Sequence, residues 1–508
     1  MTQSPTQPAH QTNRANDRTP TMHTTNGAPA CCDANADTPP LHLIFVPFLS
    51  RSHFGPVTAM AAEADACHRG GRTAATIVTT RHFAAMAPAS VPVRVAQFGF
   101  PGGHNDFSLL PGEVSAAAFF AAAEEALAPA LGAAVRGLLR EGGSTATVTV
   151  VSDAVLHWAP RVARECGVLH VTFHTIGAFA AAAMVAIHGH LHLREAMPDP
   201  FGVDEGFPLP VKLRGVQVNE EALVHLPLFR AAEAESFAVV FNSFAALEAD
   251  FAEYYRSLDG SPKKVFLVGP ARAAVSKLSK GIAADGVDRD PILQWLDGQP
   301  AGSVLYACFG STCGMGASQL TELAAGLRAS GWPFLWVIPT TAVEVTEQEE
   351  RASSHGMVVA GRWAPQADIL AHRAVGGFLS HCGWNSILDA ISAGVPLATW
   401  PLRAEQFLNE VFLVDVLRVG VRVREAAGNA AMEAVVPAEA VARAVGRLMG
   451  DDDAAARRAR VDELGVAART AVSDGGSSCG DWAELINQLK ALQLTLSRDR
   501  RTDAVTRD

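Results

Sequence analysis

Charged residues are scarce in this sequence, at 18% of 508 residues, whereas hydrophobic residues make up 49%. Basic residues are the scarcer of the two charged classes: 41 Lys and Arg stand against 52 Asp and Glu, a formal net charge of -11. This balance argues against a nucleic acid or an anionic membrane as the partner, because both are bound by basic faces. A small molecule is the expected partner.

Cysteine is also scarce, and no segment has the pattern of a targeting or membrane element. The eight cysteines are scattered without the spacing of a disulfide framework, which fits a reducing compartment. The first residues are polar and lack the apolar core of a signal peptide, and no apolar run reaches the roughly 18 residues of a membrane span. The sequence therefore predicts a cytoplasmic protein without a membrane span.

The length of the chain favours two domains, since one hydrophobic core usually organises fewer residues. Residues 1–40 lack periodicity and predict a disordered leader. Beyond them, short apolar runs alternate with helix-like stretches, which is typical of doubly wound α/β domains. The predicted parts are an N-terminal Rossmann-like domain (41–255), a polar linker (256–300), a C-terminal Rossmann-like domain (301–477) and a final helix and tail (478–508) that we expect to pack on the first domain.

The predicted fold class is thus α/β, with two Rossmann-like domains that face each other across a cleft. Open α/β sheets bind ligands at the carboxyl ends of their strands, so both sheets would present their ligand-binding edges to this cleft. We expect the chain to act as a monomer.

The most informative motif spans residues 363–406, from WAPQ to RAEQ. Its centre, FLSHCGWNSILDAISAGVP, predicts a strand, a glycine-containing turn and a short helix with Asn385 or Ser386 at its N-cap and Gly394 at its end. A helix start directs free N–H groups and a positive dipole end at an anion, so a diphosphate is the expected ligand. His381, Asn385 and Ser386 add side-chain donors, although Ser386 as a helix cap alone stays open.

This segment resembles the donor-binding box of plant family-1 UDP-glycosyltransferases. The stretches PFLSRSHFGPV, VVFNSFAALEADF and VLYACFGS resemble other segments of the family in the family's order, so the resemblance covers roughly residues 41–490. It implies the GT-B fold and a UDP-dependent glycosyltransferase. The implied reaction transfers glucose from UDP-glucose, with inversion, to a hydroxyl of an apolar small molecule such as a flavonoid, another phenolic, a terpenoid or a steroid. Neither a metal nor another cofactor is expected.

The resemblance assigns two groups of binding residues. Trp363 would stack on uracil, with a core aromatic as the alternative, and Gln406 is the form typical of glucose users. Those assigned to UDP are Ser311, Trp363, Ala364, Gln366, His381, Asn385, Ser386 and Asp389, and those assigned to the sugar are Thr175, Trp384, Glu405 and Gln406.

Asp389 departs from the family pattern, because the family usually has the longer Glu there to bind both ribose hydroxyls. Its place three residues after Ser386 also fits a capping box. We therefore keep two interpretations of Asp389, a weaker ribose contact and a helix cap.

Two further residues resemble the family's catalytic pair. His53 follows the first predicted strand, with Ser52 in place of the family's usual Gly, and Asp153 ends the strand TVTVVSD. An imidazole titrates near neutral pH, so His53 would remove the proton of the acceptor hydroxyl while Asp153 orients the ring. Donors aimed at the departing diphosphate would stabilise its charge. An ordinary loop histidine is the alternative for His53.

Two other function classes stay open, a UDP-sugar epimerase or hydrolase and a catalytically quiet UDP-sugar or small-molecule binding protein. Ser52 and Asp389 are the features that favour the quiet protein. The acceptor itself is not predicted, because residues 85–115 and 185–225 carry no recognisable motif.

Other motifs are set aside. Asp451–Asp453 and the pair Asp288 and Asp290 are interpreted as a helix cap and as linker residues rather than as a metal-binding DxD site. The glycines near Gly310 lack the Lys-Ser/Thr of a nucleotide-binding Walker loop.

Overall fold

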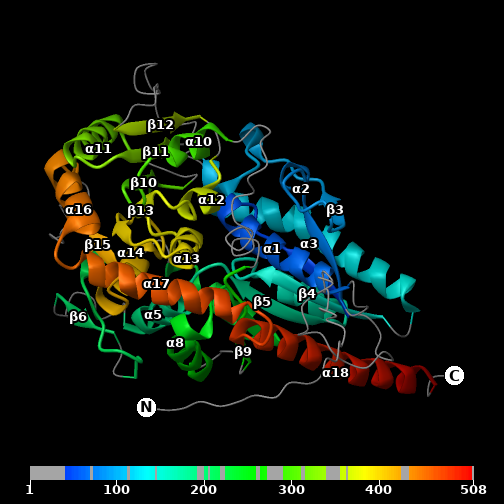
Figure 1. Ribbon diagram of the computed structural model, residues 1–508. Coiled ribbons are helices and arrows are strands. Elements are labelled where there is room, and N and C mark those ends of the chain that lie inside the picture. The colour runs from blue at the N-terminus through cyan, green and yellow to red at the C-terminus, as the bar shows by residue number, and fades with distance from the viewer. Residues whose placement is uncertain are drawn as a thin grey trace, which may run out of the picture.

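The computed structural model contains two parallel sheets, each packed between helices (Figure 1). Every pairing within the two sheets is parallel, which fits the continuous apolar runs of the predicted strands. The structure describes residues 41–68, 73–110, 115–143, 146–190, 199–203, 206–217, 223–258, 262, 264–271, 290–310, 315–338, 355–361, 364–424 and 434–505.

The first sheet has seven strands in the order β3-β2-β1-β4-β5-β8-β9. The chain turns outward in both directions from the neighbours β1 and β4, which makes their carboxyl ends the switch point where such sheets bind ligands. The strands are β1 (Leu41–Val46), β2 (Thr73–Thr80), β3 (Val93–Ala96), β4 (Thr147–Asp153), β5 (Leu169–His174), β8 (Ala238–Phe241) and β9 (Val265–Leu267).

Helices cover both faces of this sheet. One face packs on α1 and α18, whose Leu485, Ile486 and Leu489 join its core, and the other packs on α3 and α4. Remaining helices of the first domain connect or flank the strands. Their bounds are α1 (Arg51–His68), α2 (Arg81–Ala84), η2 (Pro101–Gly103), η3 (Phe107–Leu109), α3 (Ala116–Glu141), α4 (Ala159–Glu165), α5 (Ala178–His190), η6 (Gly215–Gln217), α7 (Leu226–Glu233) and α8 (Ala245–Ser257), with a small antiparallel pair β6 (Phe201–Gly202) and β7 (Lys212–Leu213).

The second sheet has six strands in the order β12-β11-β10-β13-β14-β15. Here β10 and β13 are the neighbours at the switch point. The strands are β10 (Val304–Cys308), β11 (Phe334–Ile338), β12 (Gly356–Ala360), β13 (Val375–Ser380), β14 (Leu397–Thr399) and β15 (Gly420–Arg422). The helices are α10 (Pro291–Asp297), α11 (Ala317–Ala329), α12 (Gln366–Leu370), α13 (Trp384–Ala393), α14 (Gln406–Val411), its π-helical continuation η7 (Phe412–Val416), α16 (Ala438–Gly450), α17 (Ala454–Ala471) and α18 (Ser477–Val505).

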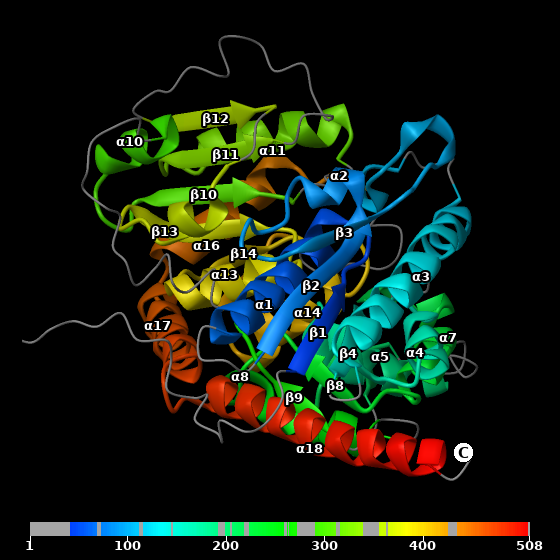
Figure 2. The ribbon, with the colours of Figure 1, turned by 90° about the vertical axis from the view of Figure 1, so that its right-hand side faces the viewer.

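The final helix α18 lies along the first domain (Figure 2). The Asp481 carboxylate accepts the Leu267 N–H at 2.7 Å, and the Ser478 hydroxyl donates to the Gly269 carbonyl at 2.6 Å. These bonds and the apolar contacts tie the end of the chain to strand β9.

The described part of the predicted linker, 256–300, includes the strand β9 and the helix α10. Strand β9 belongs to the first sheet, and α10 begins after Asp290, whose carboxylate accepts the Ile292 N–H at 2.8 Å. Asp290 is therefore a helix cap rather than a linker residue. The predicted leader and Asp288 lie outside the described residues.

The run Asp451–Asp453 precedes α17. Asp453 occupies the N-cap position, but its side chain makes no capping bond, and Asp451 lies 3.5 Å from the Arg457 guanidinium. The aspartates thus lie at the start of this helix as predicted, although the cap bond itself is not formed.

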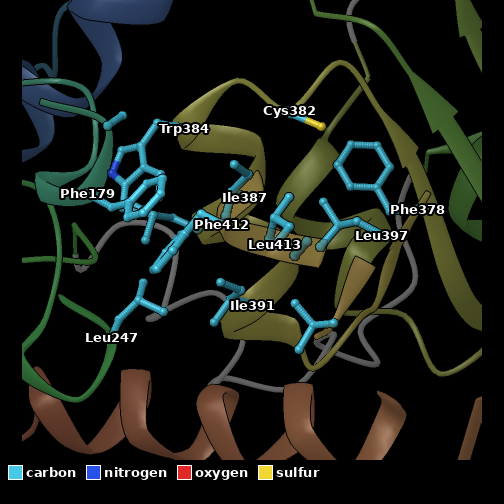
Figure 3. Close-up of a cluster of buried hydrophobic side chains, with 14 of the residues drawn as sticks. Phe179, Leu247, Phe378, Cys382, Trp384, Ile387, Ile391, Leu397, Phe412 and Leu413 are labelled. Carbon is cyan, nitrogen blue, oxygen red and sulfur yellow. The ribbon is translucent and has the colours of Figure 1, made fainter. Parts of the chain in front are cut away.

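The two domains share one hydrophobic core (Figure 3). Phe179 of α5 stacks on Phe412 of η7 with ring centroids 4.8 Å apart, and Phe251 of α8 meets the same ring at 5.8 Å. Burial of aromatic rings across the boundary stabilises one relative placement of the domains.

Helix α3 is, among the described helices, the one long and apolar enough to cross a membrane by length and composition. Its side chains Phe119, Leu127 and Leu131 are fully buried in the core of the first domain. We interpret α3 as a domain helix that happens to be rich in alanine.

Cys479 is disulfide-bonded. Cys166, Cys308 and Cys382 are free. The scattered spacing of the cysteines therefore did not predict the bond at Cys479.

Candidate active site

His53 lies at the start of α1, directly beyond the carboxyl end of β1, and Asp153 ends the neighbouring β4. The His53 Nδ1 atom is 2.8 Å from Asp153 Oδ2 and 3.0 Å from the Thr175 hydroxyl oxygen. With Nδ1–H donated to the carboxylate, Nε2 is the ring nitrogen left to accept a proton.

Asp153 is buried and makes a second hydrogen bond. Its side chain is 1% exposed, and its second oxygen accepts the Val155 N–H at 3.1 Å. Burial lowers the pKa of His53, but the charge and hydrogen bond of Asp153, together with the charge of Glu405, raise it more, so the pKa lies above 6.5. Glu405 belongs to the second domain, and its influence shows that both domains contribute to the electrostatics of His53.

Aromatic rings of the first domain extend away from His53. Phe48 meets the imidazole edge-on at 5.5 Å, and Phe120 stacks on Phe48 at 4.9 Å. Phe107 lies 5.2 Å from Phe48, and Phe229 lies 6.5 Å from Phe120. This aromatic cluster gives His53 an apolar neighbourhood on the side of the first domain.

Helix α13 starts at the carboxyl end of β13, with Gly383 as its N-cap and Gly394 (φ 72°) as its left-handed C-cap. The prediction of Asn385 or Ser386 as N-cap is wrong, because both residues lie inside the first turn. The first N–H groups of a helix have no acceptor within it, so the N–H groups of Trp384, Asn385 and Ser386 are available to an anion.

His381 stands beside this helix start, with its ring against two glycine backbones. A Cβ atom at Gly310 would lie 2.9 Å from His381 Nε2, and one at Gly383 would lie 2.6 Å away. Burial, and then the charge of Arg403, lower the pKa of His381 to about 4. The imidazole is therefore neutral at pH 7 and has one N–H to donate.

Asn385 connects the two domains at the site. Its side-chain N–H donates to the Ser52 carbonyl at 2.6 Å, and the Ser52 and Ser50 hydroxyl oxygens lie 3.0 Å apart. Because the bond to Asn385 uses the backbone of residue 52, Ser in place of Gly leaves it intact.

Gln366, Ser386 and Asp389 meet between α12 and α13. The Gln366 side-chain amide donates to Ser386 Oγ at 3.2 Å and to Asp389 Oδ2 at 2.9 Å. Since the N-cap is Gly383, Ser386 and Asp389 do not form a capping box, and the carboxylate is held beside the other residues assigned to UDP.

The side chains of Trp384 and Gln406, both assigned to the sugar, bond to the protein itself. The Trp384 indole is 2% exposed and donates its N–H to the Asn242 carbonyl at 2.8 Å, so its side chain has no donor left for a hexose. Gln406 is 7% exposed, and its side-chain oxygen accepts the N–H groups of Leu402 and Arg403 at 2.9 and 3.0 Å. The assignment of Trp384 to the sugar stays a prediction that its indole N–H cannot serve, and Gln406 has only its amide N–H groups to offer.

The structure describes two of the other assigned residues and leaves two outside its described ranges. Ala364 is buried in the shared core, and the Glu405 carboxylate accepts from the Asn409 amide at 3.4 Å. Ser311 and Trp363 lie outside the described residues. Across the described part of the chain no group of three or more His, Cys, Asp or Glu side chains is arranged to hold a metal ion.

Three residues near the Trp384 indole were not predicted from the sequence. Asn242 accepts its N–H, Gly177 packs against its ring, and Glu248 lies beside Gly177. Asn242 and Glu248 belong to the quoted stretch VVFNSFAALEADF, and that likeness was the one local signal for them.

Comparisons with known proteins find relatives over most of the chain. Residues 281–445 match the family described as "UDP-glucoronosyl and UDP-glucosyl transferase". UDP-glycosyltransferase 73C7 of Arabidopsis thaliana is 33% identical over 489 residues, which cover 89% of this chain and 97% of that protein. UDP-glycosyltransferase 73C11 of Barbarea vulgaris is 34% identical over 494 residues, with 89% and 97% covered.

Solved structures are similar over nearly the whole chain. Glycyrrhiza uralensis UGT73P12, complexed with glycyrrhetinic acid 3-O-monoglucuronide, has a TM-score of 0.74 and 28% identity and covers 92% of this chain and 99% of its own. Medicago truncatula UGT71G1, complexed with UDP-glucose, has a TM-score of 0.70 and 26% identity, with 89% and 98% covered.

Proposed function

The chain belongs to the plant UDP-glycosyltransferases, and from this premise we propose that it transfers glucose from UDP-glucose, with inversion, to a hydroxyl of an apolar small molecule. The comparisons confirm the family resemblance, the two-domain GT-B fold and a UDP-dependent glycosyltransferase. Membership supports transfer from a UDP-sugar to a small-molecule acceptor. Glucose as the sugar and the class of acceptor are part of the proposal.

The contact between His53 and Asp153 is the observation that carries the proposed mechanism. The acceptor hydroxyl gives its proton to His53 Nε2 while its oxygen attacks the anomeric carbon, and the bond from that carbon to the diphosphate oxygen breaks. Asp153 stabilises the imidazolium that forms. The departing UDP takes the electron pair, and its charge meets the first N–H groups of α13 and the neutral His381.

The aromatic cluster supports an apolar, partly flat acceptor. Phe48 lies beside the proposed base, and the half-buried Phe107 and Phe120 pack on Phe48 and would contact rings of a phenolic or a terpenoid. The Glycyrrhiza uralensis structure, which holds a glycyrrhetinic acid glucuronide, and the Medicago truncatula structure, which holds UDP-glucose, support these choices by relationship. We expect a cytoplasmic monomer that needs no metal or other cofactor.

A mass-spectrometric screen tests the proposal. The purified chain is incubated with flavonoids, other phenolics, terpenoids and steroids, with UDP-glucose or UDP-galactose as donor and with EDTA in parallel. We expect a glucoside from at least one acceptor, a preference for UDP-glucose and no effect of EDTA. Release of UDP in the absence of any acceptor would favour a hydrolase, and UDP binding without any product would favour a quiet binding protein.

A further inference from the structure

The indole of Trp384 connects the start of α13 to the first domain. Trp384 is the first residue of that helix, and its N–H bonds to the carbonyl of Asn242, 142 residues away in the sequence. In Figure 3 the ring lies beside Phe179 at the boundary between the domains. The helix that faces the diphosphate is therefore fixed to the first domain at its first residue.

Gly177 provides the space that this ring occupies. A Cβ atom there would lie 2.8 Å from Trp384 Cη2, 2.9 Å from Cζ3 and 2.8 Å from Glu248 Oε1. Real Cβ atoms do not come so close, so any side chain at Gly177 would displace the indole or the carboxylate. Gly177 also follows Thr175 by two residues, and the Thr175 hydroxyl contacts His53.

Glu248 contacts the segment that contains Gly177. Its carboxylate is 1% exposed, and its Oε1 atom accepts the Phe179 N–H at 2.7 Å, at the start of α5. The backbone of Glu248 leaves helical geometry within α8 (φ -140°, ψ 19°), which directs the side chain to this position. A buried carboxylate is costly, and burial raises the pKa of Glu248 to about 7. Nothing in the proposed mechanism uses this group.

We propose that Gly177 and Glu248 are positioning residues, which set the distance between the N-terminus of α13 and the pair His53 and Thr175. Glu248 fixes the segment from Thr175 to Phe179. Gly177 leaves room for the Trp384 ring, which places the start of α13 against this segment. The inference rests on the proposed function, because the N-terminus of α13 is the proposed donor site and His53 is the proposed base. Misplacing reacting groups by about 1 Å can cost about a hundredfold in rate.

Gly177→Ala tests the inference, with Gly189→Ala as the matched control because a Cβ atom at Gly189, near the end of α5, would meet nothing within 4 Å. We expect Gly177→Ala to lower kcat by at least about tenfold, since a shifted helix misaligns donor and base. The Kd for UDP should change by less than about threefold, because the second domain supplies most of the UDP contacts. Gly189→Ala should keep both constants.

Rescue separates positioning from damage to the fold. Trp384→Phe removes the ring atoms that the methyl group added by Gly177→Ala would meet, so the double variant should lose less activity than the two single losses predict.

The Glu248 carboxylate is tested separately. Glu248→Gln keeps an acceptor for the Phe179 N–H and should retain most of kcat, whereas Glu248→Ala should lose most of kcat. Glu253 is exposed on the same helix, and Glu253→Ala is the control.

Three outcomes would overturn the inference. They are a kcat of Gly177→Ala within about twofold of the unaltered enzyme, fully additive losses in the double variant, and parallel loss of kcat, UDP affinity and Tm, which would mean a folding defect. Absence of transfer by the unaltered enzyme would instead refute the proposed function, and this inference with it.

Discussion

At the residue scale, the proposed chemistry depends on two side chains that follow or end adjacent strands. His53 and Asp153 are 100 residues apart in the sequence but 2.8 Å apart in the structure, because β1 and β4 pair in parallel. The sequence predicted both residues through their place after apolar strands and their likeness to a family. It could not predict that Thr175 also contacts Nδ1, because that contact depends on how β5 and the segment after it are placed.

Asp153→Asn should lower kcat by at least about a hundredfold, because the amide no longer stabilises the imidazolium or fixes the tautomer. The pH profile should shift as well. A base must be unprotonated, so activity of the unaltered enzyme falls as the pH drops through the His53 pKa, which lies above 6.5 because Asp153 and Glu405 outweigh burial. Without the carboxylate this acidic limb of kcat/KM should move to lower pH. A limb that stays in place would show that another group titrates.

Asp389→Glu should strengthen donor binding. The longer carboxylate reaches further from α13 toward the ribose, and one added hydrogen bond is worth about 0.5–1.5 kcal/mol, or about two- to tenfold in KM for UDP-glucose. The kinetic comparison should be run beside Asp368→Glu, an acidic residue of α12 that has no role in the proposed site. An unchanged KM in Asp389→Glu would mean that the shorter side chain is no handicap, since Gln366 already holds it in place.

Helices and strands were predicted well where their sequence signals lie within the element itself. The strand, turn and helix around α13 follow from an apolar run, glycines and a helix-ending Gly394, and the structure has all three. The N-cap was misplaced because Gly383 caps the helix with its backbone and leaves no side-chain signature. The elements β9 and α10 were missed inside the predicted linker because a three-residue strand and a short helix carry almost no periodicity.

Helix α18 should hold the first domain through its first turn as well as its apolar face. Asp481→Ala leaves the Leu267 N–H without its acceptor and should lower the free energy of unfolding by about 1–3 kcal/mol, measured by urea denaturation. Glu484→Ala, in the next turn of the same helix, serves as a control, because the exposed Glu484 carboxylate accepts from the Gln488 side chain within α18. Equal losses in both variants would mean that helix propensity, rather than the Asp481 bond, accounts for the effect.

The whole molecule depends on a core shared between its domains. Phe179, Phe251 and Phe412 meet across the boundary, and the Trp384 indole lies in the same cluster. Such contacts join residues from distant parts of the chain, so no local pattern in the sequence predicts them. Chain length and the alternation of apolar runs with helix-like stretches were sufficient to predict two α/β domains. The way in which the domains meet could be found only from the structure.

Phe412→Ala should destabilise both domains together. Removing a buried aromatic side chain typically costs about 3–5 kcal/mol, so we expect a lower midpoint of denaturation with a single transition followed by circular dichroism. Phe412→Leu should lose less, since it refills most of the space. Two separate transitions in the unaltered protein would contradict the shared core, because they would show that the domains unfold independently.

The most direct test of the account is to measure kcat and the Kd for UDP of His53→Ala with an acceptor found in the screen. The account predicts that transfer falls by at least about a hundredfold, as removal of a general base should, while UDP binds as before. The same turnover in His53→Ala as in the unaltered enzyme would contradict the assignment of His53 as the base and the mechanism built on it.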